Sequence, residues 1–152
     1  NVIYSGTMAA AVEGALEEIP SVGFSLLDNA PNADFSESEP YIRKIIKEVL
    51  NNGLDTGVCL NVNIPKRVKN KNIKGIKVCR QANANWKEEF EERIDPKGKT
   101  YYWLTGKFVN YDEGKDTDEW ALANHYISVV PVQFDITAYS SLLSTNKLLI
   151  DE

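Results

Sequence analysis

Ser5-Gly6-Thr7, followed at once by Met8-Ala9-Ala10-Ala11-Val12-Glu13-Gly14-Ala15-Leu16-Glu17, is the stretch that decides the fold of this chain. Its apolar residues recur at the three-to-four spacing of a helix with one buried face: Met8, Ala11, Val12, Ala15, Leu16 and Ile19. The run Val22-Gly23-Phe24-Ser25-Leu26-Leu27 follows and is apolar without alternation, as in a parallel strand that is covered on both faces. The stretch therefore predicts a helix packed on a parallel sheet.

The next part of the chain repeats this pattern after a loop at 28–35. A helix is expected over 38–51, ended by Asn52-Gly53, with these residues inward: Tyr41, Ile42, Ile45, Ile46, Val49 and Leu50. A strand over 58–64 stops at Pro65, and the alternation of helix and strand is typical of a parallel α/β layer. Because a crossover helix normally follows a strand, we expect the first strands of the sheet to precede this stretch.

Beyond Pro65, short runs rich in strand-forming residues replace the long helical patterns. Strands are expected at 76–81, 126–132 and 134–136, with a short helix at 118–124 and a last helix over 138–149. The two runs on either side of Asp95-Pro96-Lys97-Gly98 resemble the arms of a projecting hairpin.

Composition limits the classes of function. The chain has 152 residues, 43% of them hydrophobic, which is enough for one domain with a core. A net charge of -5 argues against binding of a nucleic acid duplex, so any phosphate partner should be small. Cys59 and Cys79 lie in apolar runs, so we expect both to be reduced residues of the core. Reduced cysteines favour a cytoplasmic protein. No long apolar segment suggests a membrane.

The junction at Ser5, Gly6 and Thr7 is the strongest candidate for binding an anion. A hydroxyl, a glycine and a second hydroxyl at the first turn of a helix leave backbone N–H groups unpaired, with the positive end of the helix dipole behind them. Each charge-assisted bond to a phosphoryl oxygen contributes about 1.5 to 3 kcal/mol. For this motif alone, a plain N-cap by Ser5 or Thr7 is the more common role.

A second candidate is the pair of carboxylates at Asp116 and Asp118. Two such side chains one residue apart in a loop can bind a divalent cation or act as acid and base. The alternative, favoured for the motif alone, is that Asp116 caps the helix at 118–124, with Glu119 completing a capping box.

Two asparagines form a third candidate. Asn61 and Asn63 flank Val62 in a strand, so both point to one face, toward a polar site at the strand's carboxyl end. They serve equally well to satisfy neighbouring loop backbone. The single histidine, His125, has no serine and aspartate in a recognisable triad order, which disfavours a triad hydrolase.

Aromatic residues gather in the expected hairpin at Trp86 and at Tyr101-Tyr102-Trp103. Such side chains either stack on the bases of single-stranded RNA or pack against a sheet or a second subunit, and packing is favoured here. The lysines between 66 and 77 lack interleaved aromatics and are interpreted as a solvated loop.

Several separated segments share their sequence and order with one known family. They are Asn1-Val2-Ile3-Tyr4-Ser5-Gly6-Thr7 with Ala10-Ala11 and Glu13-Gly14, Leu60-Asn61-Val62-Asn63-Ile64-Pro65, Gly75-Ile76-Lys77-Val78, Asp95-Pro96-Lys97-Gly98 with Tyr102-Trp103, Thr117-Asp118, and Tyr126-Ile127-Ser128-Val129-Val130-Pro131 with Asp135-Ile136-Thr137. Along nearly its whole length, the chain resembles the C-terminal portion of the SurE family of nucleotidases.

The resemblance implies a metal-dependent phosphohydrolase that releases phosphate from nucleoside 5'- and 3'-monophosphates, with short polyphosphate as a further substrate. The implied cofactor is Mg2+ or Mn2+, and the family's metal ligands and catalytic carboxylates correspond to positions upstream of Asn1. This chain is therefore expected to be inactive alone. Ser5, Gly6 and Thr7 match the family's phosphate-contacting turn. Four further residues are expected to surround this turn without contacting the phosphate themselves: Asn61, Asn63, Asp116 and Asp118.

The implied fold is α/β: a Rossmann-like, three-layer SurE fold with a parallel sheet, a projecting β-hairpin and a C-terminal helix that is exchanged between subunits of a homodimer or homotetramer. The expected boundaries are a single truncated domain over 1–152, with the α/β core at 1–65 and 106–137, the hairpin at 85–105, and the helix and tail at 138–152.

One position departs from the family pattern. Tyr139 stands where many members have a histidine, so a salt bridge from Asp135 to this position is not expected. The alternative to an enzyme is a non-catalytic module that oligomerises and binds anions.

Overall fold

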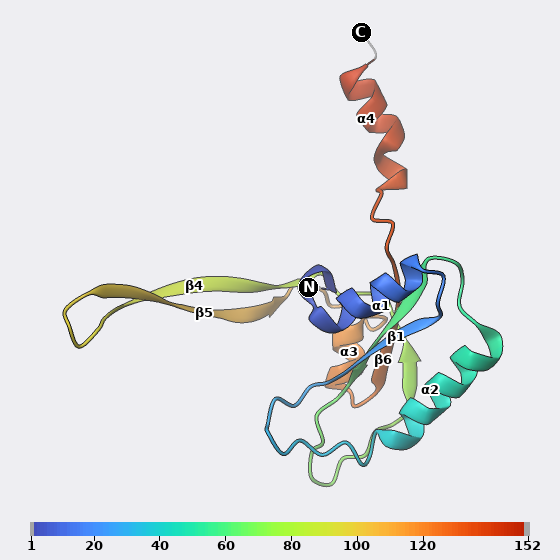
Figure 1. Ribbon diagram of the computed structural model, residues 1–152, viewed down its shortest axis with the longest axis horizontal. Helices are drawn as coiled ribbons and strands as arrows, with labels where there is room; N and C mark the ends of the chain where they lie inside the picture. Colours follow the sequence, from blue (N-terminus) through green and yellow to red (C-terminus); the bar gives the residue numbers. More distant parts are fainter. Residues whose placement is uncertain (1, 151–152) are drawn as a thin grey trace.

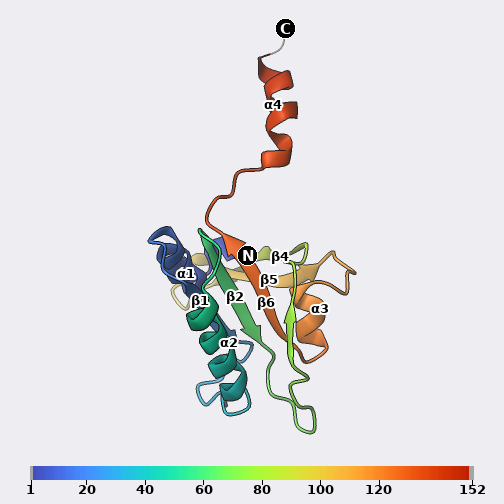
Figure 2. The same ribbon diagram turned by 90° about the vertical axis from the view of Figure 1, so that its right-hand side faces the viewer.

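The structure is a computed structural model that describes residues 2–150; Asn1 and the tail at 151–152 lie outside the described residues. Its elements, in chain order, are η1 (Val2–Tyr4), α1 (Gly6–Leu16), β1 (Ser21–Leu26), α2 (Glu39–Asn52), β2 (Val58–Ile64), β3 (Ile76–Val78), β4 (Ala84–Ile94), β5 (Thr100–Asn110), α3 (Asp118–Ala123), β6 (Ile127–Gln133), η2 (Tyr139–Ser141) and α4 (Leu142–Leu149). Helix α2 covers one face of a sheet while α1 and α3 cover the other, which confirms the three-layer α/β fold (Figures 1 and 2).

The main sheet has the strand order β1-β2-β6-β3. Strands β1 and β2 are parallel, as the repeated helix and strand pattern predicts. Strand β6 runs antiparallel to β2, and β3 is parallel to β6. The sheet is therefore mixed: the predicted parallel pair is extended by a second pair that runs in the opposite direction.

Some predicted strand limits are wrong. Strand β3 ends at Val78 rather than at 81. Strand β6 ends at Gln133, and the predicted separate strand at 134–136 does not form. Past Val78, the Cys79 N–H still donates to the Val129 carbonyl at 2.9 Å, and a bridge pairs Arg80 with Thr117. The chain leaves the sheet there to enter the hairpin.

Helices α2 and α3 begin and end within one residue of the predicted limits, whereas the predicted start of the last helix at 138 is wrong, because η2 comes first and α4 begins at Leu142. Ser5 is the N-cap of α1, and Gly53 ends α2 with a φ of 72°, a left-handed conformation that glycine adopts without strain. Gly23 of β1 has a different role. A Cβ at Gly23 would come within 2.7 Å of the Met8 sulfur, so its absence lets α1 approach the sheet closely.

The core confirms most of the predicted inward residues. Buried residues of α2, β2 and β6 form one cluster: Ile45, Val49, Val62, Ile64, Ile127 and Val129. Met8, Ala11 and Ala15 of α1 pack with Cys59 on the other face. The predicted burial of four residues is wrong, because between 41% and 78% of each residue stays exposed: Leu16, Ile19, Ile46 and Leu50. The described sheet ends at β1, so the helix faces beyond that edge have no strand to cover.

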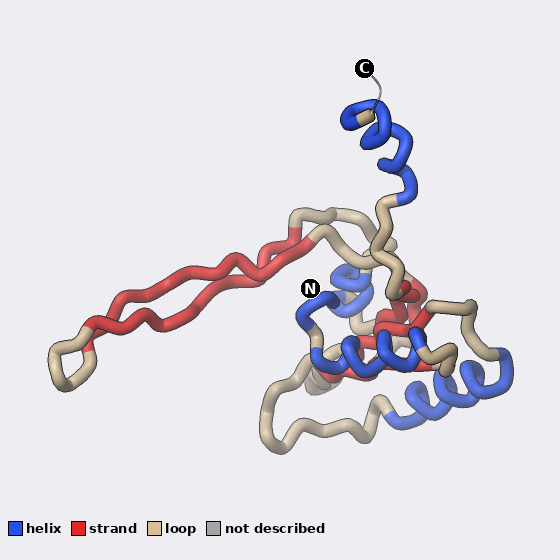
Figure 3. The backbone as a smooth tube through the Cα atoms, turned by 45° about the horizontal axis from the view of Figure 1, so that its top comes forward, coloured by secondary structure: helices blue, strands red, loops and turns tan. Residues whose placement is uncertain are grey.

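A hairpin and a helix project from the layered body (Figure 3). Strands β4 and β5 pair over their whole length, and β5 continues to Asn110, beyond the predicted end at 105. The turn between them is held by Asp95, whose carboxylate accepts from the N–H groups of Lys97 and Lys99 at 2.8 Å each. Helix α4 stands apart from the body in both ribbon views.

Both cysteines are confirmed as buried, free thiols. Burial raises the pKa of the Cys59 and Cys79 thiols, which keeps them protonated and unreactive near neutral pH. Within residues 2–150, no helix is long and apolar enough to cross a membrane.

Candidate functional site

The first turn of α1 combines a helix cap with open backbone donors. The Ser5 hydroxyl accepts from the Met8 N–H at 3.2 Å, so Ser5 is the N-cap. The N–H groups of Gly6 and Thr7 have no acceptor among the described residues, and both residues are exposed. A Cβ placed on Gly6 would meet nothing within 4 Å. The capping and the anion-binding interpretations are therefore compatible, because Ser5 caps the helix while the next two amides keep no acceptor among the described residues.

A polar cavity of about 250 Å³ lies beside this turn. It is lined by Val2, Ser5, Met8, Ser25, Leu27, Asn61, Asn63, Gln81, Asp118, Glu119 and Leu122. Four of the residues singled out in the sequence thus share one cavity: Ser5, Asn61, Asn63 and Asp118. Gly6, Thr7 and Asp116 are not among its lining residues. The cavity lies at the carboxyl ends of β1 and β2, where ligands of α/β sheets commonly bind.

The two asparagines form the floor of this cavity. The Asn63 side-chain N–H donates to the Asn61 side-chain oxygen at 3.0 Å, which fixes both amides on one face of β2. Asn61 is only 8% exposed, and its own side-chain NH2 has no acceptor among residues 2–150. A buried amide donor directed at a cavity is suited to binding an oxygen of a ligand.

The opposite wall comes from α3 and from the segment after β3. Thr117 caps α3 by accepting from the Trp120 N–H at 3.1 Å, so the predicted cap by Asp116 is wrong by one residue. Asp118 accepts from the N–H groups of Ala82 and Glu119 at 2.8 and 2.9 Å. The bond from Ala82 anchors the start of the hairpin to the cavity wall. Both bonds are accepted by Oδ1, so Oδ2 of Asp118 accepts no hydrogen bond from the described residues.

Asp116 belongs to a separate ionic cluster. Arg80 donates from Nε to Asp116 at 2.9 Å and from Nη1 to Asp112 at 2.6 Å. The Arg80 guanidinium holds the pKa of Asp112 well below its usual range and also lowers the pKa of Asp116. Asp112 further accepts from the Asn83 N–H, next to the first residue of β4. The cluster fixes the base of the hairpin.

Glu119 is a lining residue that the sequence reasoning treated only as part of a capping box. Burial, and secondly the charge of Asp118, raise the pKa of its carboxyl group. No hydrogen bond or ion pair holds this carboxyl within the described part of the chain. The only sequence signal for it was its position directly after Asp118.

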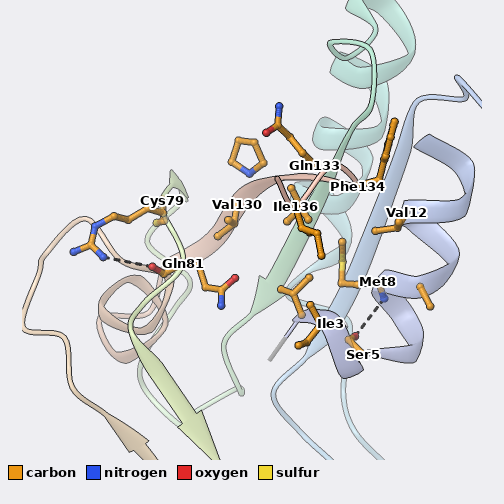
Figure 4. Close-up of a pocket in the computed structure, with 15 residues that line it drawn as sticks. Ile3, Ser5, Met8, Val12, Cys79, Gln81, Val130, Gln133, Phe134 and Ile136 are labelled. Atoms are coloured by element: carbon orange, nitrogen blue, oxygen red, sulfur yellow. Dashed lines mark hydrogen bonds between the residues drawn. The ribbon is translucent and has the colours of Figure 1, made fainter. Parts of the chain in front are cut away.

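A larger, apolar cavity of about 660 Å³ adjoins the polar one (Figure 4). The two share Val2, Ser5, Met8 and Gln81. Figure 4 shows Ile3, Met8 and Val12 on one side, with Val130 and Cys79 across from them. The start of α1 thus stands between a polar and an apolar space.

The described residues do not form a metal centre. Nowhere among residues 2–150 do three His, Cys, Asp or Glu side chains gather as metal ligands. In the polar cavity, the carboxylates are those of Glu119 and of Asp118, whose Oδ1 alone accepts hydrogen bonds from the backbone. Two carboxylates are fewer acidic ligands than a divalent cation prefers, since it takes several oxygen ligands around it.

Comparisons with known proteins identify the family. A family model described as Survival protein SurE matches residues 1–88. The chain belongs to the SurE family. It is 63% identical over 146 residues to a 5'-nucleotidase SurE of Flavobacterium psychrophilum and 67% identical over 139 residues to that of Christiangramia forsetii.

A SurE crystal structure shares the fold. The SurE protein from Aquifex aeolicus aligns with a TM-score of 0.77 at 39% identity and covers 97% of this chain. The architecture described above is therefore the Rossmann-like SurE fold. The chain spans about half the length of the relatives it matches, with 56% and 53% of the two nucleotidases and 58% of the Aquifex aeolicus chain.

Proposed function

We propose that the protein containing this chain is a nucleotidase that releases phosphate from nucleoside 5'-monophosphates and 3'-monophosphates. The observation that carries the proposal is the open first turn of α1, where the N–H groups of two exposed residues, Gly6 and Thr7, have no acceptor among the described residues and a polar cavity lies beside the turn. The SurE relatives that the chain matches are named 5'-nucleotidases, which supports the same reaction here.

The residues of this chain would bind and orient the phosphate. Phosphoryl oxygens accept from the N–H groups of Gly6 and Thr7, and the dipole of α1 favours their negative charge. The free amide donor of Asn61 reaches the cavity from the floor. All these donors would bind only the terminal phosphate. The same turn could therefore bind the phosphate of a 5'-ester, of a 3'-ester or at the end of a short polyphosphate.

A divalent cation, Mg2+ or Mn2+, would supply charge neutralisation and activation of the attacking water. The described residues do not supply its ligands, so we place these ligands in the part of the SurE length that this chain does not span. The chain alone is then inactive. Its free thiols at Cys59 and Cys79 support a reducing, cytoplasmic setting.

The test uses Gly6, the first residue of α1. Gly6→Pro removes one N–H donor, yet proline is well tolerated at the first helical position and the extended Ser5 suits a following proline. Gly6→Ala keeps the donor and meets no neighbour, which makes it the matched control. In the full-length protein with Mn2+, we expect Gly6→Pro to lower kcat/KM for adenosine 5'-monophosphate about tenfold or more, and Gly6→Ala to leave it nearly unchanged.

Equal activity of the two variants would contradict the binding role of the turn. The same assay on residues 1–152 alone tests the metal proposal, because turnover by this chain would show that it carries its own metal site.

Assembly through the projecting elements is a second proposal, favoured by the faces of the hairpin. Residues paired directly across β4 and β5 share a face, and one face exposes six large apolar or aromatic side chains beside two glutamates, Glu88 and Glu92: Trp86, Phe90, Ile94, Tyr102, Leu104 and Phe108. Helix α4 likewise exposes Leu142, Leu143, Leu148 and Leu149. Apolar surface of this extent is typical of interfaces.

We propose that two or four copies of the chain bury these surfaces in a homodimer or homotetramer. Light scattering on the full-length protein and on Phe90→Lys tests this, with Glu91→Lys on the other face of β4 as the control. We expect Phe90→Lys to lower the molar mass and the control to keep it. If both variants keep the mass, the hairpin is not the interface. A stable assembly without phosphate release would favour a non-catalytic module.

Binding of single-stranded RNA receives less support from the hairpin. Trp86 and Tyr102 lie on one face of the ribbon, whereas Tyr101 and Trp103 lie on the other. The guanidinium of Arg93 covers the Trp103 ring at 5.4 Å. The aromatic residues therefore form no common platform on which successive bases could stack.

A further inference from the structure

Glu119 is the one carboxylate in the polar cavity that has no bonding partner among the described residues. Its neighbour Asp118 accepts from two backbone N–H groups, at 2.8 and 2.9 Å. Glu119 lines the same cavity, half-buried, and α3 is positioned by the Thr117 cap so that Glu119 stands on the wall opposite α1. Because polar groups in a cavity are normally hydrogen-bonded, we expect a ligand in this cavity to donate a hydrogen bond to the Glu119 carboxylate.

The charges of the cavity orient a phosphate ester within it. The α1 wall presents backbone N–H groups and the positive end of a helix dipole, whereas the α3 wall presents two carboxylates. A phosphate dianion is attracted to the first wall and repelled by the second. The uncharged part of the substrate must therefore lie toward Glu119.

The bonding of a nucleoside monophosphate indicates which part that is. Its phosphate is esterified directly to the pentose, and the base is attached to the far side of the sugar. The apolar cavity that adjoins the polar one suits the less polar base. The group next to Glu119 is then the sugar, whose hydroxyls are donors that a carboxylate accepts, as acidic residues do in dinucleotide-binding folds.

We propose that Glu119 determines sugar specificity by accepting hydrogen bonds from the ribose hydroxyls of a nucleoside 5'-monophosphate. The proposal rests on the nucleotidase function proposed above. It makes the protein selective for ribonucleotides over 2'-deoxyribonucleotides, because the deoxy substrate leaves one acceptor of the buried carboxylate without a donor.

The test compares adenosine 5'-monophosphate with 2'-deoxyadenosine 5'-monophosphate on the full-length protein with Mn2+. We expect kcat/KM to favour the ribonucleotide about tenfold to a hundredfold in the wild type, as for a hydrogen bond to a charged group. Glu119→Leu should bring the ratio close to one by lowering only the ribonucleotide value, and Glu119→Gln should give an intermediate ratio. The control is Glu113→Leu, an exposed glutamate in the loop before α3, which should keep the wild-type ratio.

The outcomes separate this proposal from the proposed function. An unchanged ratio in active Glu119→Leu or Glu119→Gln enzyme overturns the role of Glu119 and leaves the nucleotidase intact. Absence of phosphate release from every nucleoside monophosphate by the wild type overturns the nucleotidase and this inference with it. Inhibition by adenosine and by 2'-deoxyadenosine gives a second readout, because the same ratio should appear there without any phosphate being released.

Discussion

The two faces of β2 show how one strand serves stability and chemistry at once. Val62 and Ile64 point toward α2 and are 0% and 2% exposed in an apolar cluster. Asn61 and Asn63 alternate with them, point toward α1 and α3, and line the polar cavity. Because the side-chain period of a strand is two, a single segment supplies both environments without mixing them. An amide placed on the apolar face should therefore lower the stability of the fold, and an apolar residue placed on the cavity face should lower the activity.

The largest effect is expected from placing an amide on the apolar face. Val62→Asn buries a polar group among Ile45, Val49 and Ile127, where no donor or acceptor is free to pair with it. We expect a loss of about 3 kcal/mol in the free energy of unfolding, read from the urea midpoint. Val62→Ala separates the lost packing from the buried amide and should cost less. A Val62→Asn protein as stable as the wild type would show that the two faces are not distinct.

The reverse exchange on the cavity face should act on activity instead. Asn61→Val removes an amide whose NH2 has no acceptor among residues 2–150, so we expect the free energy of unfolding to change by less than about 1 kcal/mol. Phosphate release by the full-length protein should fall about tenfold or more, because one donor to the phosphoryl group is lost. Loss of stability with unchanged kcat/KM would place Asn61 in the core rather than in the site.

Ser5 allows stability and phosphate binding to be tested at one position. Ser5→Ala removes the cap on Met8 and should cost about 1 kcal/mol, whereas Ser5→Asp restores a good cap and complements the helix dipole. The aspartate, however, places a negative charge where the phosphate is proposed to bind. We therefore expect Ser5→Asp to be as stable as the wild type in thermal denaturation but to have a strongly raised KM. An unchanged KM would show that the phosphate does not bind at this turn.

A smaller, pH-dependent effect is expected at the base of the hairpin. The pKa of Asp112 is lowered by its bond to Arg80, so its contribution is present above the usual aspartate pKa and is lost as pH falls through the folded value. Asp112→Asn should thus loosen the hairpin at neutral pH and make the acid response of the hairpin smaller. Limited proteolysis within 80–116 at two pH values measures this. An identical cleavage pattern in both proteins at neutral pH would contradict the role of the cluster.

The order of helices and strands in the body could be predicted from sequence because each carries its own local signals. The spacing of Met8, Ala11 and Ala15 identifies a buried helix face, and the alternation at Asn61 and Asn63 places both amides on one side of a strand. These features depend on residues that are close in the chain, and the predictions made from them are largely correct.

What could not be predicted depends on distant parts of the chain. Asp116 and Thr117 are both competent caps, and Arg80, which lies 36 positions before Asp116, draws the aspartate away and leaves the cap to the threonine. The approach of Glu119 to the wall opposite Ser5 depends on how α3 packs on β6. Leu16 and Leu50 are exposed because the described sheet ends at β1, which no helical periodicity reveals.

The smallest effect is expected at the start of the segment that carries α4. Tyr139 cannot form the salt bridge that a histidine would make, but its hydroxyl donates to Asp135, and this bond raises the pKa of Tyr139. Hydrogen bonds from Thr137, and secondly from Tyr139, lower the pKa of Asp135. Both residues are exposed on the link between β6 and α4, so Tyr139→Phe should leave the urea midpoint of the body unchanged. The bond nevertheless limits the directions in which α4 can leave the body. Tyr139→Phe should therefore speed proteolytic cleavage between 135 and 142, whereas Tyr4→Phe, another exposed tyrosine, should not. Equal cleavage rates would mean that α4 is directed by its surroundings in an assembly and not by this hydrogen bond.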